Sequence, residues 1–91
     1  MSQKRKKAVA LKYDATKSSA PEVTASGAGA VAEKIIKEAE QHEVPIMEDL
    51  SLTELLSELN INEVIPDELY QAVAEVFAFI YRADQETNSK K

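Results

Sequence analysis

Few residues in this chain could support acid–base, nucleophilic or metal chemistry. Its 91 residues include one histidine and no cysteine, which excludes thiolate nucleophiles and cysteine-ligated zinc or iron–sulfur sites. The histidine, His42, stands between Gln41 and Glu43 with no nucleophile beside it, and one histidine cannot build a zinc site. We therefore expect no cofactor, no enzymatic activity and a solvent-facing His42 at a helix end.

A Gly-x-Gly pattern at Gly27 and Gly29 precedes a predicted helix, as it does in phosphate-binding loops. The third glycine of a dinucleotide fingerprint would fall at Ala32, where alanine is allowed in some fingerprints, and Glu48 or Asp49 could be the acidic ribose ligand. The chain nevertheless has too few strands for the doubly wound sheet that such a site requires. The pattern favours glycines that let the chain turn tightly from strand to helix.

Charge is distributed unevenly along the chain. The net charge is −5, but residues 1–17 hold six Lys and Arg against one Asp, giving +5, and the remainder holds five against fifteen, giving −10. A basic arm of this kind could bind RNA or an acidic membrane face. Because no aromatic residue is interleaved among the basic ones for base stacking, the pattern favours a solvated tail. A small nucleic-acid-binding accessory protein remains the alternative function.

Three short runs have the length and composition of β-strands, at residues 8–13, 21–25 and 45–48. Residues 21–48 read as strand, helix, strand, which normally makes a right-handed crossover between parallel strands. We expect a flexible basic tail over 1–7, a single domain over 8–83 and a disordered polar tail over 84–91. No stretch approaches 18 consecutive apolar residues, so we expect no membrane span and a cytoplasmic protein.

Helical periodicity marks three further segments. The first is expected to begin at Ser26 and to end near His42. Ser51 and Glu54 have the spacing of a capping box that would start the second helix. Pro66 suits the first position of the third helix, whose apolar residues surround most of its circumference. We expect this third helix to be the most buried element, laid against the sheet.

Four stretches carry a resemblance to a known family. They are residues 8–14 (Ala-Val-Ala-Leu-Lys-Tyr-Asp), 20–23 (Ala-Pro-Glu-Val), 44–46 (Val-Pro-Ile) and 65–76 (Ile-Pro-Asp-Glu-Leu-Tyr-Gln-Ala-Val-Ala-Glu-Val). In order and spacing they resemble the cytoplasmic C-terminal domain of the flagellar type III export-gate switch protein, the FlhB, EscU and SpaS family. The resemblance covers about residues 8–82. It implies an α/β fold: a small mixed β-sheet of about three strands, mainly parallel with one antiparallel, packed by about three helices. Residues 8–13 would be antiparallel to the parallel pair 21–25 and 45–48.

In that family the sequence Asn-Pro-Thr-His precedes the first of these strands, and asparagine cyclisation cuts the chain there. The corresponding positions hold Gln3, Lys4, Arg5 and Lys6. Because none of the four family residues is present, the resemblance does not imply autocleavage. We expect the chain to be a stand-alone counterpart of the downstream half of the cleaved domain.

The resemblance also implies a function in protein transport. It points to a non-catalytic interaction module of the flagellar or type III secretion export apparatus, substituting for or modulating the cleaved downstream half. Its partners would be the upstream half of the switch protein, other gate components or export cargo, with no small-molecule substrate. In the family the upstream strand lies beside the strand that corresponds to residues 8–13. A missing upstream strand would leave an edge that binds a partner segment or is shielded by the basic tail. The residues of this edge are Ala8, Val9, Ala10, Leu11, Lys12 and Tyr13.

Overall fold

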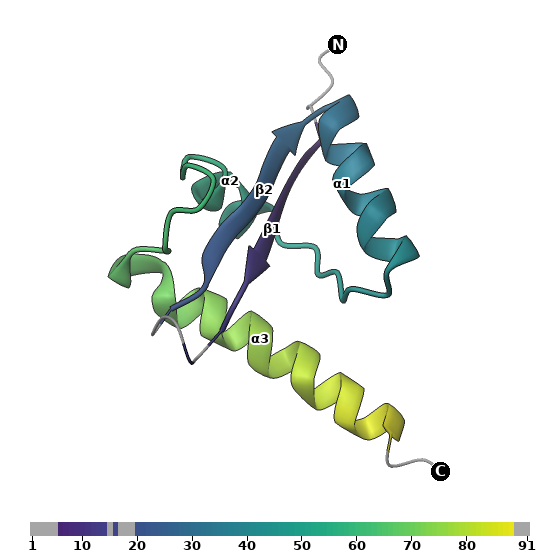
Figure 1. The fold of residues 1–91 in the computed structure, drawn as a ribbon. Helices are drawn as coiled ribbons and strands as arrows, with labels where there is room; N and C mark the ends of the chain where they lie inside the picture. The colour runs from purple at the N-terminus through teal and green to yellow at the C-terminus, as the bar shows by residue number, and fades with distance from the viewer. Residues whose placement is uncertain (1–5, 15, 17–19, 89–91) are drawn as a thin grey trace.

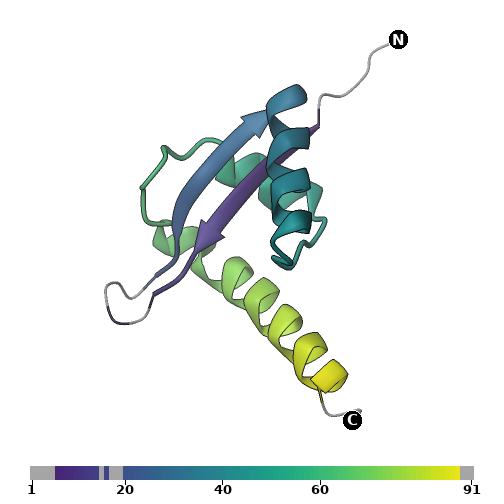
Figure 2. The same cartoon turned by 45° about the vertical axis from the view of Figure 1, so that its right-hand side comes forward.

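The computed structural model describes residues 6–14, 16 and 20–88, and of residues 82–88 it describes the backbone alone. Within these ranges two strands are followed by three helices: β1 (Lys7–Lys12), β2 (Glu22–Ala28), α1 (Ala30–Gln41), α2 (Leu50–Leu56) and α3 (Asp67–Asn88). Helices α1 and α2 lie on opposite faces of the strand pair, and α3 crosses beneath it (Figures 1 and 2). The α/β class and the three predicted helices are confirmed.

Strands β1 and β2 are antiparallel, which confirms the direction predicted for residues 8–13. Ala8 pairs with Gly27 and Ala10 pairs with Ala25, and the register then shifts between Ala10 and Leu11. Thr24 is the extra residue of this bulge, and its Oγ1 donates a hydrogen bond to the carbonyl oxygen of Ala10 at 3.3 Å. A bulge of this kind bends the strand and increases its local twist.

Residues 45–48 do not form the strand that we predicted. In the described part of the chain the sheet contains β1 and β2 alone, so the predicted parallel pair of 21–25 and 45–48 was wrong. The apolar composition of 45–48 suits a strand, but a strand also needs a neighbour for its backbone groups. Strand β1 occupies one side of β2, and residues 62–65 occupy the other side next to Pro21 and Val23, so residues 45–48 have no place beside that part of the predicted strand 21–25.

Small residues let α1 approach its face of the strand pair closely. Ala8 and Ala32 are buried, and a Cβ added to Gly27 would lie only 2.2 Å from Cγ1 of Val31. Strand β2 therefore continues through Ser26 and Gly27, where we had predicted the start of a helix. The turn follows at Gly29, which has a φ of 62°, a value that glycine adopts without a steric penalty. The tight strand-to-helix turn is confirmed at Gly29, whereas Gly27 lies within β2.

The apolar core lies on the opposite face, between the strands, α2 and α3. Its buried residues come from both helices and from the link between them, and Val9 and Leu11 of β1 pack against it. They are Leu52, Leu56, Ile65 and Val73. Each helix thus uses one apolar stripe to cover the strand pair.

Helix α2 begins differently from the prediction. Its N-cap is Asp49, whose carboxylate accepts a hydrogen bond from the backbone N–H of Leu52 at 3.0 Å. The predicted capping box of Ser51 and Glu54 was wrong, because the helix already starts at Leu50 and Ser51 lies within its first turn. Asp and Ser are comparable N-caps, so the sequence alone did not discriminate between them.

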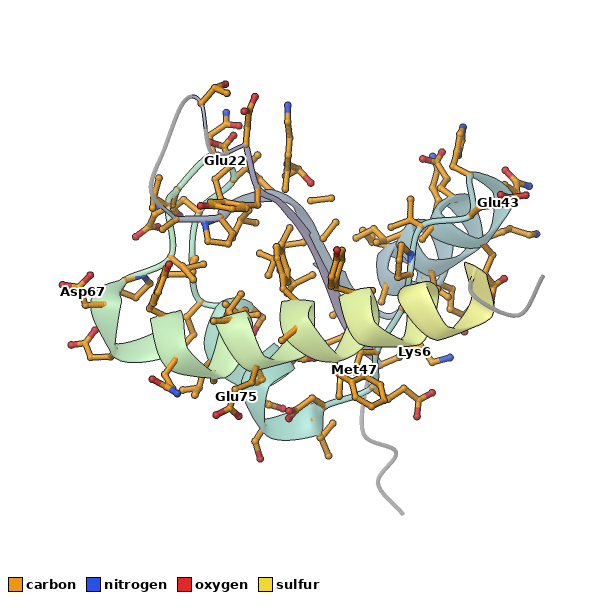
Figure 3. All side chains as sticks on the ribbon, turned by 90° about the horizontal axis from the view of Figure 1, so that it is seen from below. Lys6, Glu22, Glu43, Met47, Asp67 and Glu75 are labelled. Atoms are coloured by element: carbon orange, nitrogen blue, oxygen red, sulfur yellow. The ribbon has the colours of Figure 1, made fainter. Side chains whose placement is uncertain are left out.

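Helix α3 is less buried than expected. The carbonyl of Pro66 accepts the N–H of Leu69 at 3.0 Å, and Val73 is 1% exposed. Phe79 and Tyr81, however, are exposed, because the C-terminal half of the helix extends past the strands (Figures 1 and 3). The prediction that α3 is the most buried element was therefore wrong. Its backbone is helical to residue 88, past the predicted domain limit at 83, and residues 89–91 lie outside the described ranges.

Candidate functional site

The outer edge of β2 is closed over its first residues by the link between α2 and α3. The N–H of Val23 donates to the carbonyl of Glu63 at 2.9 Å, and the N–H of Asn62 donates to the carbonyl of Val23. The N–H of Ile65 donates to the carbonyl of Pro21 at 3.0 Å. This part of the edge cannot accept another strand without losing these bonds.

Among the residues that the structure describes, the outer edge of β1 has no comparable cover. The N–H of Gly29 donates to the carbonyl of Lys6 at 2.7 Å, which makes Lys6 and Gly29 a hydrogen-bonded pair. In an antiparallel ladder bonded and non-bonded pairs alternate, so Ala8 and Ala10 face β2, and Lys7 and Val9 face outward. Beyond the bulge, Val23 bonds to residues 62 and 63 rather than to β1, so its partner Leu11 also faces outward.

The outward N–H and C=O groups of β1 thus belong to Lys7, Val9 and Leu11. Among residues 6–14, 16 and 20–88, no backbone hydrogen bond from outside the strand pair reaches them. Ser26 and Ala28 of β2, which pair with Val9 and Lys7, face outward on the other side by the same alternation. The longer unpaired row is therefore on β1.

The predicted edge residues differ in whether their backbone groups face outward. Ala8 to Lys12 lie in β1 and Tyr13 follows the strand, where its ring meets that of Phe77 edge to face at 6.3 Å. Only Val9 and Leu11 of the predicted residues present outward backbone groups, and Lys7 joins them although the prediction omitted it. That this edge binds a partner stays a prediction. Of the positions that replace the cleavage motif, Lys6 is described, and residues 3–5 lie outside the described ranges.

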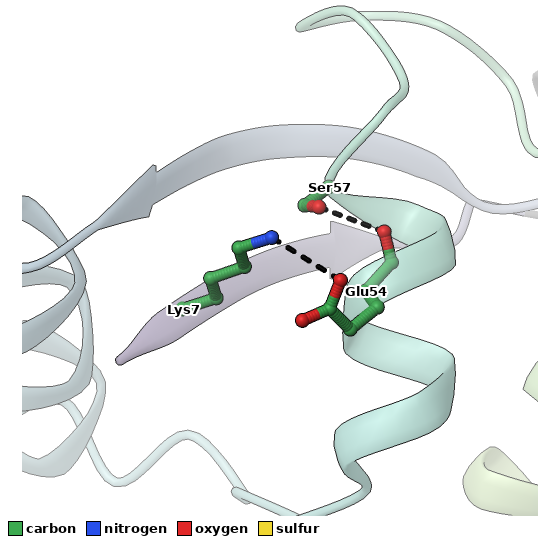
Figure 4. A network of polar contacts seen from close by, with 3 residues as sticks. All are labelled: Lys7, Glu54 and Ser57. Atoms are coloured by element: carbon green, nitrogen blue, oxygen red, sulfur yellow. Dashed lines mark hydrogen bonds and ion pairs between the residues drawn. The ribbon is translucent and has the colours of Figure 1, made fainter. Parts of the chain in front are cut away.

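The lysines at this edge differ in how their surroundings are arranged. Lys7 Nζ lies 3.2 Å from Glu54 Oε1 on α2, and the carbonyl of Glu54 accepts the hydroxyl of Ser57 (Figure 4). Lys12 is paired with Glu22 across the ladder. Lys6 shares a shallow hollow of about 220 Å³ with residues of α1, including Glu33 and Glu40. Of these three lysines, Lys7 is the one that forms an ion pair among the described residues, and its charge is balanced by Glu54.

At the far end of β1, Asp14 organises the chain as it leaves the strand. Its carboxylate accepts hydrogen bonds from Thr16, from Oγ1 at 2.6 Å and from the backbone N–H at 3.0 Å. These bonds hold the pKa of Asp14 below its ordinary value, with a smaller contribution from the charge of Lys12. Asp14 therefore stays ionised at neutral pH, as a turn anchor rather than a general acid.

The other residues considered for chemistry lie apart from this edge. His42 is exposed at the C-terminal end of α1, as predicted, and its Nδ1 lies 2.9 Å from the carbonyl oxygen of Glu38. Gly27 is part of β2, and Gly29 donates its N–H to Lys6. Among the described residues no group of three or more His, Cys, Asp or Glu side chains is placed to hold a metal ion. In the same ranges, no helix has the length and apolar character that a membrane span requires.

The sequence that forms this strand pair and its three helices matches a known protein family. The family described as the FlhB HrpN YscU SpaS family matches residues 5–80, which is most of the chain. The chain belongs to this family. It is an FlhB-like α/β domain of the flagellar and type III export proteins.

Individual relatives differ in how much of their length the chain covers. The uncharacterized protein YlqH of Bacillus subtilis (strain 168) is 51% identical over 86 residues, which cover 94% of this chain and 92% of YlqH. The flagellar biosynthetic protein FlhB of the same organism is 37% identical over 79 residues, 86% of this chain but only 22% of FlhB. The chain is thus similar to one small protein over nearly its whole length, and to a fifth of the flagellar relatives.

Among solved structures, the chain is similar to the cytoplasmic domain of FlhB from Shewanella putrefaciens. The TM-score is 0.90 with 32% sequence identity, and the match covers 93% of this chain and 67% of that domain. About a third of the Shewanella domain therefore lies outside the match.

Proposed function

We propose that this chain is a non-catalytic, cytoplasmic interaction module of the flagellar or type III export apparatus. In this proposal it substitutes for or modulates the downstream half of a switch protein of its own family. It binds the upstream half of that protein, which adds an extended segment to the outer edge of β1. Other gate components and export cargo are the alternative partners.

The observation that carries this proposal is the row at Lys7, Val9 and Leu11, whose outward backbone groups have no backbone partner among the described residues. An extended segment is the kind of partner that can satisfy outward N–H and C=O groups spaced along a strand, and strand addition uses this geometry. The related Shewanella domain holds about a third of its length outside the match, so the match does not cover every segment of that domain.

A peptide titration tests the proposal. The probe is a peptide of about ten residues, enough for one strand, taken from directly upstream of the matched region in Bacillus subtilis FlhB. We expect the amides of Lys7, Val9 and Leu11 to shift in NMR spectra and to exchange more slowly with solvent. No change at about millimolar peptide, or protection centred on Ser26 and Ala28, would contradict the proposal.

Two proline variants give a matched comparison. Val9→Pro removes an outward donor of β1 and leaves the bonds to β2 intact, so it should abolish peptide binding while the domain stays folded. Ser26→Pro removes an outward donor from the residue paired with Val9, on the opposite edge, and should leave binding unchanged. Equal binding by the two variants would show that the peptide does not pair with β1. Circular dichroism of both variants checks that the fold is retained.

A further inference from the structure

The outer edge of β2 changes along the strand from covered to open. Next to Pro21 and Val23 it is closed by residues 62–65. In Figures 1 and 2 this closing link lies beside the N-terminal end of β2, away from the end that leads into α1. The outward N–H and C=O groups of Ser26 and Ala28 have no backbone partner in the ranges that the structure describes. The C-terminal half of β2 is therefore a second open edge, opposite the one on β1.

This edge lacks the charged side chains that commonly protect an open strand. Charged residues make up 30% of the chain, yet residues 23–32 contain none. The edge of β1, by contrast, carries Lys6, Lys7 and Lys12. Because charges on an edge strand discourage pairing between copies of a chain, self-pairing is opposed at β1 and is not opposed in this way at the C-terminal half of β2.

A second copy of the chain is the partner that this uncharged edge fits. Two copies repel each other over most of their surface, because each carries a net charge of −5. The exposed apolar residues 44–47, for example, are flanked by Glu43 and Glu48, so two such segments would bring like charges together. Residues 23–32 allow two identical chains to meet without such repulsion. They also offer no charge by which a strongly acidic or basic partner would recognise them.

We propose that two copies of the chain pair antiparallel through the C-terminal halves of their β2 strands, about a twofold axis at Gly27. In this register Ser26 of one copy lies opposite Ala28 of the other, so all four outward residues are paired. The two Gly27 residues form a non-hydrogen-bonded pair, whose Cα atoms in such a ladder are about 4.5 Å apart. The dimer then holds four strands in the order β1, β2, β2, β1.

Val31 supplies the apolar contact of this dimer. It is exposed at the start of α1, and a Cβ atom added to Gly27 would clash with its Cγ1. The Val31 side chain therefore covers Gly27 on the face of the sheet that carries α1. Since the twofold axis passes through the Gly27 pair, the two Val31 side chains meet next to the axis and remove apolar surface from water.

This dimer goes beyond the proposed function and does not depend on it. The second copy uses the edge of β2, and the partner segment uses the edge of β1, so the two contacts do not compete. Both β1 edges lie at the outer ends of the four-stranded sheet, so the dimer would present two partner sites.

Measurements at increasing protein concentration, without any peptide, test this proposal. The contact is small, so we expect a dissociation constant on the order of 1 mM or lower. Analytical ultracentrifugation from roughly 0.05 to 2 mM protein should show the average mass rising toward that of a dimer. Amide hydrogen exchange at Ser26 and Ala28 should slow over the same range, and exchange at Val9 should not change. A monomer at about 2 mM, or protection at Val9 instead of Ser26, would overturn the proposal and leave the proposed function standing.

Two aspartate variants with the same added charge give a matched comparison. Val31→Asp places like charges beside the twofold axis and should weaken self-association at least about tenfold. Val44→Asp lies away from this edge and should change it by no more than about twofold. The two side chains are similarly exposed, at 54% and 52%, and circular dichroism checks that both variants stay folded. Equal dissociation constants for the two variants would overturn the proposal.

The proline variants described above test the backbone pairing. Ser26→Pro removes an outward donor of β2 and should abolish the rise in mass with concentration, whereas Val9→Pro should leave that rise unchanged. This order is the reverse of the one expected for peptide binding, so the two proposals fail separately. Dimerisation of Ser26→Pro at the level of the unaltered chain would overturn pairing through β2.

Discussion

The two outer edges of the strand pair differ in how the chain completes them. At β2, residues 62–65 bond to Pro21 and Val23, and Ile65 is 4% exposed. At β1, the outward groups of Lys7, Val9 and Leu11 find no such backbone partner within the described ranges. Small size alone does not explain an open edge, because the same chain covers part of the other edge with four residues. The covered edge contributes to the stability of the fold, and the open edge is the one at which we propose that a partner binds.

The largest expected effect is a loss in the free energy of unfolding when the closed edge of β2 is altered. Ile65→Ala removes buried methyl and methylene groups from the closed edge and should lower the free energy of unfolding by about 2–5 kcal/mol. Leu55→Ala on α2, where the side chain is 49% exposed, should change it by no more than about 0.5 kcal/mol. Urea denaturation of the two variants measures the difference. Similar losses would show that residues 62–65 do not close β2 in solution.

A smaller effect is expected from the ion pair at the open edge. Lys7 and Glu54 connect the start of β1 to α2, but their side chains are 34% and 57% exposed. Such a pair contributes at most about 0.2–1 kcal/mol and is screened by salt. Lys7→Ala and Glu54→Ala should each reduce stability by that amount at low salt and by less at high salt. A loss of several kcal/mol in a double-mutant cycle would mean that this edge is held more firmly than the exposures indicate.

Patterns within single elements predicted much of this fold. The strand near 8–13 and the three helices follow from local composition and periodicity, which are fixed by the residues themselves, whereas the antiparallel direction of that strand was implied by the family resemblance. The segment 45–48 shows the limit of that approach. Its side chains favour a strand, but whether a strand forms depends on a neighbour whose backbone groups the sequence does not reveal.

Prediction from local sequence patterns has the same limit for the individual residues of the candidate site. Sequence reasoning proposed the whole run from Ala8 to Tyr13, whereas outward groups alternate and begin at Lys7. The choice between the two alternating sets depends on the bond between Gly29 and Lys6, which forms only after the chain has turned at Gly29. A residue-level prediction of the edge therefore required the pairing register, and composition could not supply it.

The smallest expected effect concerns Asp14, at the end of the open edge. Hydrogen bonds from Thr16, chiefly from its hydroxyl, hold the pKa of Asp14 below its ordinary value, which is about 4. A carboxyl group whose pKa is lower in the folded state stabilises the fold above its unfolded pKa, and this contribution is lost as pH falls through the folded pKa. Thr16→Ala should therefore raise the pKa of Asp14 and make stability less dependent on pH just below pH 4. An NMR titration of the Asp14 carboxyl group in both proteins checks this. Identical titration curves would show that the Thr16 hydroxyl does not bind Asp14 in solution.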